Sequence, residues 1–355
     1  MATRRSFLAA AASSAAASAT PSKSRHRLGL DFFSLRSQGW SAFELLDFAA
    51  RNGAQVGHFS EPRFLGSTEP GHLQKVREHA AKLGLEIEVG FGSICPTSTR
   101  FVKEDGSAPD QLRRMLGVAQ ALGSKIVRCY LGSANERTGD LPLEAHIENT
   151  IASCKAVRDD FLRAGVKIAL ENHAGDLQAL QLRSLIEEAG TDYVGALLDS
   201  GNATWTLEDP LHTLEALAPI AVTSGIRDSR IWSVPEGANV MWVPFGKGNI
   251  GIRKFAARFQ ELRPDLTFAL EMINVPGPRT FAHRRPEFWD AYRDVPAWVF
   301  AGFEKLASQG RPYQAPQPPD RIQPKTDAHK AWARELERTD AEADLRFCRE
   351  ELGFG

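Results

Sequence analysis

The chain has 355 residues, of which 25% are charged, and a formal net charge of −1 at pH 7. This length accommodates one barrel of about 250 residues with extensions, or two ordinary domains. The near-neutral charge does not favour a nucleic-acid-binding protein, and without an apolar run of about 18 residues we predict no membrane span.

The N-terminus, residues 1–19, resembles an export signal. Arg4 and Arg5 precede a weakly hydrophobic Ala/Ser run that ends in Ala17-Ser18-Ala19, a small-residue cleavage site. We therefore predict a twin-arginine signal peptide and a periplasmic or other extracytoplasmic location. The alternative is a disordered low-complexity terminus.

After a linker at residues 20–27, strand and helix patterns alternate. The expected strands are Leu28–Phe33, Gln55–Phe59, Leu85–Phe91, Ile126–Leu131, a strand ending at Glu171, Val194–Leu198, Ile220–Thr223 and Leu266–Leu270. The expected helices are Ala42–Arg51, Leu73–Leu83, Pro109–Leu122, Leu143–Ala164, Leu180–Ala189, Pro210–Leu217, Ile252–Leu262 and Pro286–Ser308. Eight such units predict an α/β protein with a (β/α)8 TIM barrel over residues 28–310. An open doubly wound sheet is the alternative.

Two segments depart from the alternation. Ser229–Gly248 is too long for a simple strand–helix connection, so we expect a lid or binding loop. Residues 311–355 form a Pro-rich link followed by a charged helix over Asp327–Leu352. This C-terminal helical extension could dock on the barrel, stay loose, or pair with a second subunit in a homo-oligomer.

Glu171, Asp199 and Glu271 each follow an apolar strand, the fifth, sixth and eighth. The carboxyl ends of barrel strands face one mouth, so we expect these three acids to converge there. Three carboxylates in a partly dry pocket repel one another, and a divalent cation relieves that repulsion. Alternatively, each acid caps the following helix or pairs with an arginine.

The motifs that contain these acids resemble those of the xylose-isomerase-like sugar (phosphate) isomerase/epimerase superfamily over roughly residues 28–308. The motifs are Leu170-Glu171-Asn172-His173, Leu198-Asp199-Ser200-Gly201-Asn202, Ser224-Gly225-Ile226-Arg227-Asp228, Gly246-Lys247-Gly248-Asn249-Ile250 and Leu270-Glu271. The resemblance implies that Glu171, Asp199 and Glu271 bind a metal and that Glu171 and Glu271 are catalytic. Gly225 stands where the family usually has a histidine ligand. The remaining ligands are all oxygens, which favours Mn²⁺ or Mg²⁺ over Zn²⁺.

Neighbouring polar and aromatic residues are candidates for substrate binding. The candidates are His173, Asn202, Arg227, Asp228, His58 and Trp232, with Arg128 and Tyr130 as further wall residues and Trp205 and Trp242 as apolar platforms for sugar rings. Arg227 resembles the family arginine that contacts a substrate oxygen. Each candidate also has a structural alternative, such as an ion pair between Arg227 and a nearby aspartate.

We expect a metal-dependent isomerase or epimerase, or a related lyase on a 3-keto-glycoside, acting on a small carbohydrate. Proton abstraction next to a carbonyl would give an enediolate. The alternative is a catalytically degenerate barrel that binds carbohydrate and has lost its metal-ligand histidine at Gly225. Metal-dependent hydrolysis with several zinc ions is a third interpretation, and the few histidines argue against it.

Overall fold

The computed structural model describes residues 26–273 and 277–355. The predicted signal peptide and the linker as far as residue 25 lie outside the described residues. Among the described helices, none combines the length and apolar character needed to cross a membrane.

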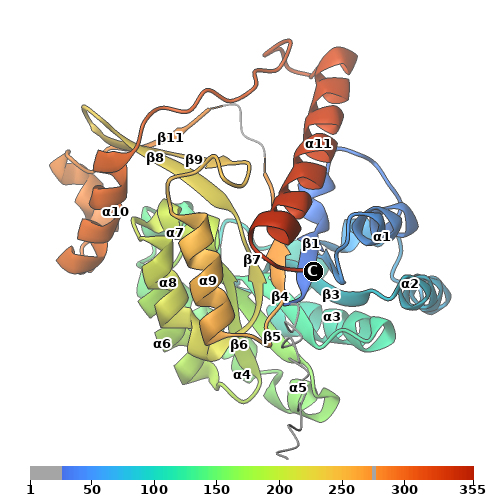
Figure 1. The fold of residues 1–355 in the computed structure, drawn as a ribbon. Coiled ribbons are helices and arrows are strands. Elements are labelled where there is room, and N and C mark those ends of the chain that lie inside the picture. The colour runs from blue at the N-terminus through green and yellow to red at the C-terminus, as the bar shows by residue number, and fades with distance from the viewer. Residues whose placement is uncertain (1–25, 274–276) are drawn as a thin grey trace, which may run out of the picture.

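Eight parallel strands form the predicted barrel, with the order β10-β1-β2-β3-β4-β5-β6-β7 (Figure 1). The strands are β1 Leu28–Asp31, β2 Val56–Phe59, β3 Glu86–Ser93, β4 Ile126–Tyr130, β5 Lys167–Glu171, β6 Val194–Asp199, β7 Ala221–Gly225 and β10 Phe268–Leu270. Between β7 and β10 the ring is completed by a short parallel bridge, in which Ile226 pairs with Leu270. The TIM barrel fold is thus confirmed.

Helices surround the strands, so most strand residues are buried on both faces and read as apolar runs. The helices are α1 Ala42–Arg51, α2 Pro70–Leu83, α3 Ala108–Leu122, α4 Leu143–Lys155, α5 Arg158–Ala164, α6 Ala179–Ala189, α7 Ser200–Ala203, α8 Pro210–Leu217, α9 Ile252–Leu262, α10 Ala297–Gln309 and α11 Asp327–Glu351. Their ends follow local signals. Ser41 and Glu44 form a capping box on α1, and Gly84 ends α2 in the left-handed conformation.

Two predicted helices are divided in the structure. The expected helix Leu143–Ala164 breaks at Val157, where α5 begins with two acids in its first turn, a favourable position beside a helix N-terminus. The expected helix Pro286–Ser308 becomes a 3-10 segment, η7 (Pro286–Ala291), and α10. Pro296 precedes α10, since proline lacks the N–H that a helix interior requires.

The predicted loop Ser229–Gly248 is largely a β-hairpin. β8 (Asp228–Val234) pairs antiparallel with β9 (Gly237–Val243), and β11 (Arg279–Phe281) adds a third strand. Apolar and β-branched residues on both sides of Pro235-Glu236-Gly237 are the hairpin signal that the loop interpretation overlooked. The small sheet lies beside the barrel, between α10 and α11 (Figure 1).

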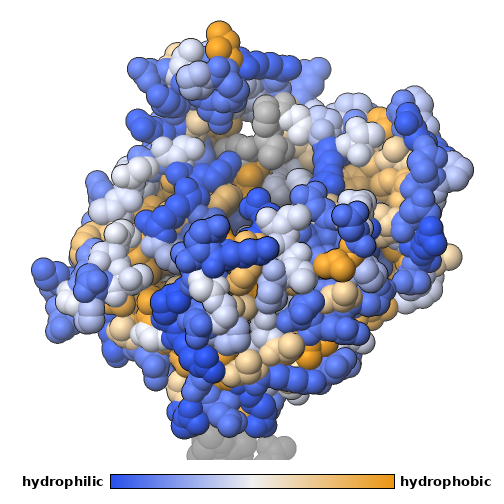
Figure 2. Space-filling model, turned by 180° about the vertical axis from the view of Figure 1, so that it is seen from behind, coloured by the Kyte–Doolittle hydropathy of each residue, from blue (hydrophilic) through white to orange (hydrophobic). Residues whose placement is uncertain are grey.

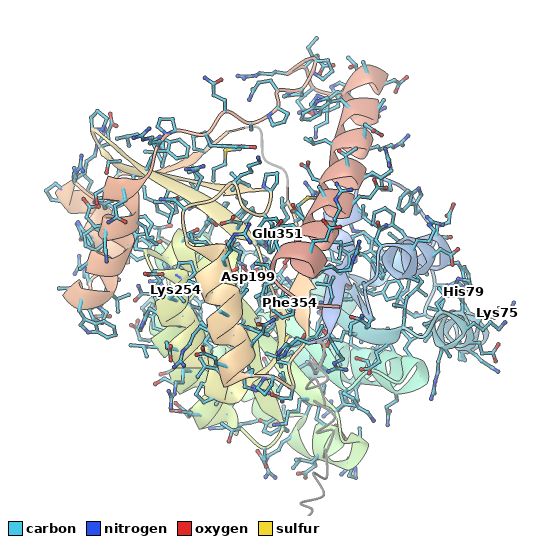
Figure 3. The ribbon with its side chains drawn as sticks, viewed as in Figure 1. Lys75, His79, Asp199, Lys254, Glu351 and Phe354 are labelled. Carbon is cyan, nitrogen blue, oxygen red and sulfur yellow. The ribbon has the colours of Figure 1, made fainter. Side chains whose placement is uncertain are left out.

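The C-terminal helix α11 docks on its own barrel. Glu337 is 2% exposed and accepts hydrogen bonds from the backbone N–H (2.9 Å) and hydroxyl (2.8 Å) of Ser37, just after the 3-10 segment η1 (Phe32–Leu35). Asp344 accepts a hydrogen bond from the backbone of Phe245 at 3.0 Å. Beyond α11 lies Phe354, which is labelled in Figure 3. Its ring stacks on Phe268 of β10 at 4.1 Å. The homo-oligomer through this helix stays a prediction.

The face of the molecule opposite to that of Figure 1 is mostly polar. Figure 2 shows a largely hydrophilic face with small, scattered apolar groups. Such scattered groups are ordinary on a protein surface, and they mark no extended docking face on this side.

Replacing Glu337 by Ala should loosen the docking of α11. The backbone N–H and hydroxyl of Ser37 would lose their acceptor, at a cost of about 1–3 kcal/mol in the free energy of unfolding. Chemical denaturation measures the change. Glu335→Ala, which removes an exposed acid from the same helix, is the matched control and should leave the midpoint unchanged. Equal effects of the two substitutions would contradict the docking role of Glu337.

Candidate active site

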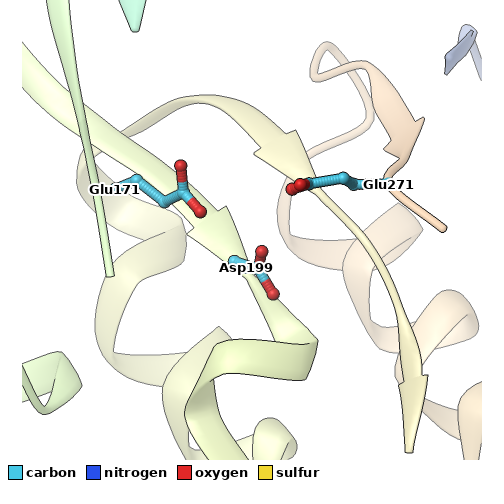
Figure 4. Close-up of side chains that lie close together, drawn as sticks. All are labelled: Glu171, Asp199 and Glu271. Atoms are coloured by element: carbon cyan, nitrogen blue, oxygen red, sulfur yellow. The ribbon is translucent and has the colours of Figure 1, made fainter. Parts of the chain in front are cut away.

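The three predicted acids meet at one rim of the barrel. Glu171 ends β5, Asp199 ends β6 and Glu271 follows β10, and they are 1%, 0% and 5% exposed. One carboxylate oxygen from each lies within 4.8 Å of the others (Figure 4). The strand register explains the convergence, because Asp199 pairs with Gly225 of β7 and the next residue, Ile226, pairs with Leu270.

Two buried arginines accompany the acids. From β4, Arg128 donates through Nε to Oε2 of Glu171 at 2.6 Å. After β7, Arg227 places Nη2 3.0 Å from Oδ2 of Asp199 and also in contact with Oε2 of Glu271. Burial opposes the charge on each guanidinium, but the surrounding carboxylates outweigh it and raise the pKa of both arginines. Three acids and two guanidiniums thus share one pocket.

Asp199 also has the capping role that the alternative interpretation gave it. Its Oδ1 accepts from the backbone of Gly201 at 2.7 Å and of Asn202 at 2.9 Å, at the start of α7. The Asn202 amide donates to both Asp199 and Glu171 at 3.0 Å. Burial raises the pKa of Asp199 well above its usual value, even though Arg227 opposes the rise. Asp199 therefore caps α7 and belongs to the acid cluster at the same time.

A cavity of about 350 Å³ opens beside the cluster. Its lining includes Glu271, Asn202, Arg227, His173 and Arg128, whereas Glu171 and Asp199 lie behind these residues. Of the three acids, only Glu271 therefore faces the cavity directly.

His173 presents a neutral ring to this cavity. Its Nδ1 lies 2.7 Å from the carbonyl of Gly132, and the ring stacks on Tyr130 at 3.8 Å. Burial and the charge of Arg128 lower the pKa of His173 to about 3. Because a carbonyl only accepts, Nδ1 carries the proton and Nε2 is left as an acceptor for a substrate hydroxyl.

Three predicted substrate-binding residues lie outside the lining of this cavity. His58 is buried beneath the rim, 3.4 Å from Oδ2 of Asp31. Asp228 accepts backbone hydrogen bonds from Ser229, Gly246 and Gly248, so it joins the ends of the β8–β9 hairpin. Trp232 packs with Met241 and Val243 in a separate apolar cluster.

Sequence reasoning underestimated several neighbours of the acids. Arg128 was expected only as a wall residue, yet it pairs with Glu171. Trp242 packs against Trp205 at 4.4 Å and under the guanidinium of Arg227 at 4.3 Å. The Asn172 side-chain amide donates to the backbone carbonyl of Asp199 and accepts from its backbone N–H. An arginine inside an apolar strand was the one available signal, since such a buried charge requires a partner.

The buried ring of His58 should remain neutral in mildly acidic solution. Burial, followed by the charge of Arg128, lowers the pKa of His58 to about 3, and burial also raises the pKa of Asp31. The unfolded chain takes up this proton below about pH 6.5 and the folded chain does not, so acidification from 6.5 towards 3 opposes folding.

Histidine NMR at pH 5 tests this expectation, with the His58→Asn variant identifying the signal. An imidazolium signal for His58 at pH 5 would contradict the burial argument.

Comparison with known proteins identifies the scaffold. Residues 35–292 match the family described as Xylose isomerase-like TIM barrel. A 3-oxo-isoapionate decarboxylase from Pectobacterium atrosepticum is 25% identical over 225 residues, which are 62% of this chain and 72% of that protein.

Solved structures show the same fold. A D-psicose 3-epimerase crystallised in the presence of D-fructose aligns with a TM-score of 0.60 at 12% identity, over 92% of this chain and 99% of that chain. The IOLI protein with a bound zinc atom aligns with a TM-score of 0.54 at 16% identity, over 79% and 96%. From the family match over most of its length, we conclude that the chain belongs to the Xylose isomerase-like TIM barrel family.

Proposed function

We propose that this protein is an exported, divalent-metal-dependent isomerase or epimerase that acts on a sugar or keto-sugar. The observation that carries the proposal is the buried cluster of Glu171, Asp199 and Glu271 beside a polar cavity. Buried carboxylates at such close range destabilise the folded state unless cations or protons compensate their charge. Such unfavourable clusters are typical of functional sites.

The residues present fit a hard divalent cation. Three carboxylate oxygens lie within 4.8 Å of one another in a buried pocket, and Gly225 contributes no nitrogen donor. Oxygen ligands suit Mn²⁺ or Mg²⁺, whereas zinc, as in the IOLI structure, is more often held by nitrogen or sulfur. Glu171, Asp199 and Glu271 would hold the ion, which when bound would polarise a substrate carbonyl and acidify the neighbouring C–H.

The chain's own residues supply the remaining steps. Glu271 faces the cavity and is placed to remove a proton next to the carbonyl. Arg227 and Arg128 offer positive charge to the oxyanion of the enediolate, and Nε2 of His173 can accept from a substrate hydroxyl. We assign Glu171 as the second acid–base group, which returns the proton. It lies behind Arg128, so this step requires a small shift of that arginine.

A second reaction class follows from the relative in Pectobacterium atrosepticum. Loss of carbon dioxide from a 3-oxo acid leaves an electron pair next to a carbonyl, which is the same enolate that proton abstraction forms. The same arginines would stabilise that anion. A decarboxylase, or a lyase on 3-keto-glycosides, is therefore the second candidate. Turnover across a substrate panel distinguishes it from the isomerase or epimerase.

Replacing Glu271 or Glu171 by Gln should lower turnover by about 10²–10⁴-fold, because an amide cannot exchange a proton with carbon. The assay is a panel of keto-sugars, 3-oxo acids and 3-keto-glycosides with added Mn²⁺. Glu208→Gln is the matched control, since Glu208 is also fully buried but lies away from the acid cluster, held by Ala179 and Thr206. Full activity in both site variants would refute the assigned roles.

Removing divalent ions separates the enzyme from the carbohydrate-binding alternative, which Gly225 favours. A chelator should abolish turnover, and added Mn²⁺ or Mg²⁺ should restore it. Calorimetry with the same sugars, with and without the chelator, measures sugar binding separately from turnover. Sugar binding that is indifferent to the chelator, without turnover of any panel member, would support a degenerate binding barrel.

A further inference from the structure

Position 225 faces directly into the acid cluster. A Cβ atom built on Gly225 would lie 3.5 Å from Oδ2 of Asp199 and 3.5 Å from Oε2 of Glu271. Gly225 is not among the glycines with positive φ, so the backbone there accepts other residues. The same Cβ would lie 3.3 Å from Cδ2 of Leu197, so a side chain at position 225 would be in direct contact with the two carboxylates.

The guanidinium of Arg227 is the positive group beside these two carboxylates. Its Nη2 contacts the same two oxygens, Oδ2 of Asp199 and Oε2 of Glu271. Its Nη1 donates to Oδ1 of Asn202 at 3.1 Å, and Trp242 lies under the guanidinium. Arg227 is 4% exposed, so these groups replace its hydration.

A second glycine makes room for the aliphatic part of Arg227. A Cβ on Gly201 would lie 2.8 Å from Cβ and 2.7 Å from Cδ of Arg227, closer than real side chains approach. Gly201 also has no positive φ. A side chain at position 201 would therefore displace Arg227 from the acid cluster.

We propose that Arg227 is a built-in counter-cation of the acid cluster, which competes with a divalent cation for Asp199 and Glu271. A guanidinium and a divalent ion in contact with the same pair of oxygens would repel each other strongly in a poorly screened pocket. Binding of the divalent ion requires Arg227 to withdraw towards the cavity, where it meets substrate. Gly225 and Arg227 together set the cation affinity of the site. This inference rests on the proposed function only in assuming that the cluster binds a divalent ion.

Manganese titration of the full chain tests the competition. Calorimetry with MnCl₂, without substrate, compares the parent protein with Arg227→Gln and with the matched control Arg258→Gln. Arg258 forms exposed ion pairs with Glu215 and Glu261 on the outside of the barrel. We expect Mn²⁺ to bind at least about tenfold more tightly to Arg227→Gln than to the parent, and equally to the parent and Arg258→Gln. Affinity in Arg227→Gln that is equal to or weaker than the parent's, or no binding by either, overturns the proposal.

Thermal unfolding keeps the test valid if Arg227→Gln is unstable. Its Tm should rise more steeply with MnCl₂ than the parent's Tm, because the ion replaces the missing positive charge. An equal rise in both proteins overturns the competition.

Introducing a histidine at position 225 tests whether a side chain there and Arg227 compete for the same two carboxylates. The gain in Mn²⁺ affinity from Gly225→His should be smaller with Arg227 present than in the Arg227→Gln background. Equal gains in Mn²⁺ affinity in both backgrounds contradict this competition. These readouts measure metal affinity alone, so failure of the proposed reaction, seen as absent turnover on the substrate panel, is distinguishable from failure of this inference.

Discussion

The mouth of the barrel depends on the balance of charge among three buried carboxylates and two buried guanidiniums. Arg128 compensates Glu171, and Arg227 compensates Asp199 and Glu271. Buried charges of one sign are strongly unfavourable, and losing one partner of such a pair costs about 3–5 kcal/mol. Asn202 reinforces the balance, because its amide reaches two of the acids at once. The site is therefore a network in which each charge requires the others.

Elements outside the barrel support this network. Trp242, from the hairpin strand β9, packs on the guanidinium of Arg227. Asp228, the next residue after Arg227, accepts hydrogen bonds from the backbone N–H groups of Gly246 and Gly248. Asp344 on α11 holds Phe245, which lies just before Gly246. The C-terminal extension is thus connected to the acid cluster through hydrogen bonds that backbone N–H groups of residues 245, 246 and 248 donate to the Asp344 and Asp228 carboxylates.

Gly225 stands where the resemblance to the family implies a histidine ligand. Glycine offers no nitrogen donor at this position, which faces Asp199 and Glu271. A neutral His173, with an acceptor nitrogen beside the cavity, suits substrate hydroxyls better than a charged ring would. Under the proposed function, the choice among isomerisation, decarboxylation and elimination would lie in how the cavity orients the substrate, since all three pass through a related anion.

The sequence by itself determined the eight-unit barrel and the convergence of Glu171, Asp199 and Glu271, because apolar strands that end in acids leave little freedom in a closed parallel sheet. It also predicted the start of α1 at Ala42 and the end of α2 at Leu83. Only the tertiary structure decided the pairing of Arg128 with Glu171, the contacts of Arg227 with Asp199 and Glu271, and the separation of Trp232 from the cavity. The arginine pairings join strands far apart in the chain, so the sequence indicated at most that Arg128, a charge inside an apolar strand, needs a partner. Pleat direction decides whether a side chain on the hairpin faces the site, as Trp242 does, or a separate apolar cluster, as Trp232 does.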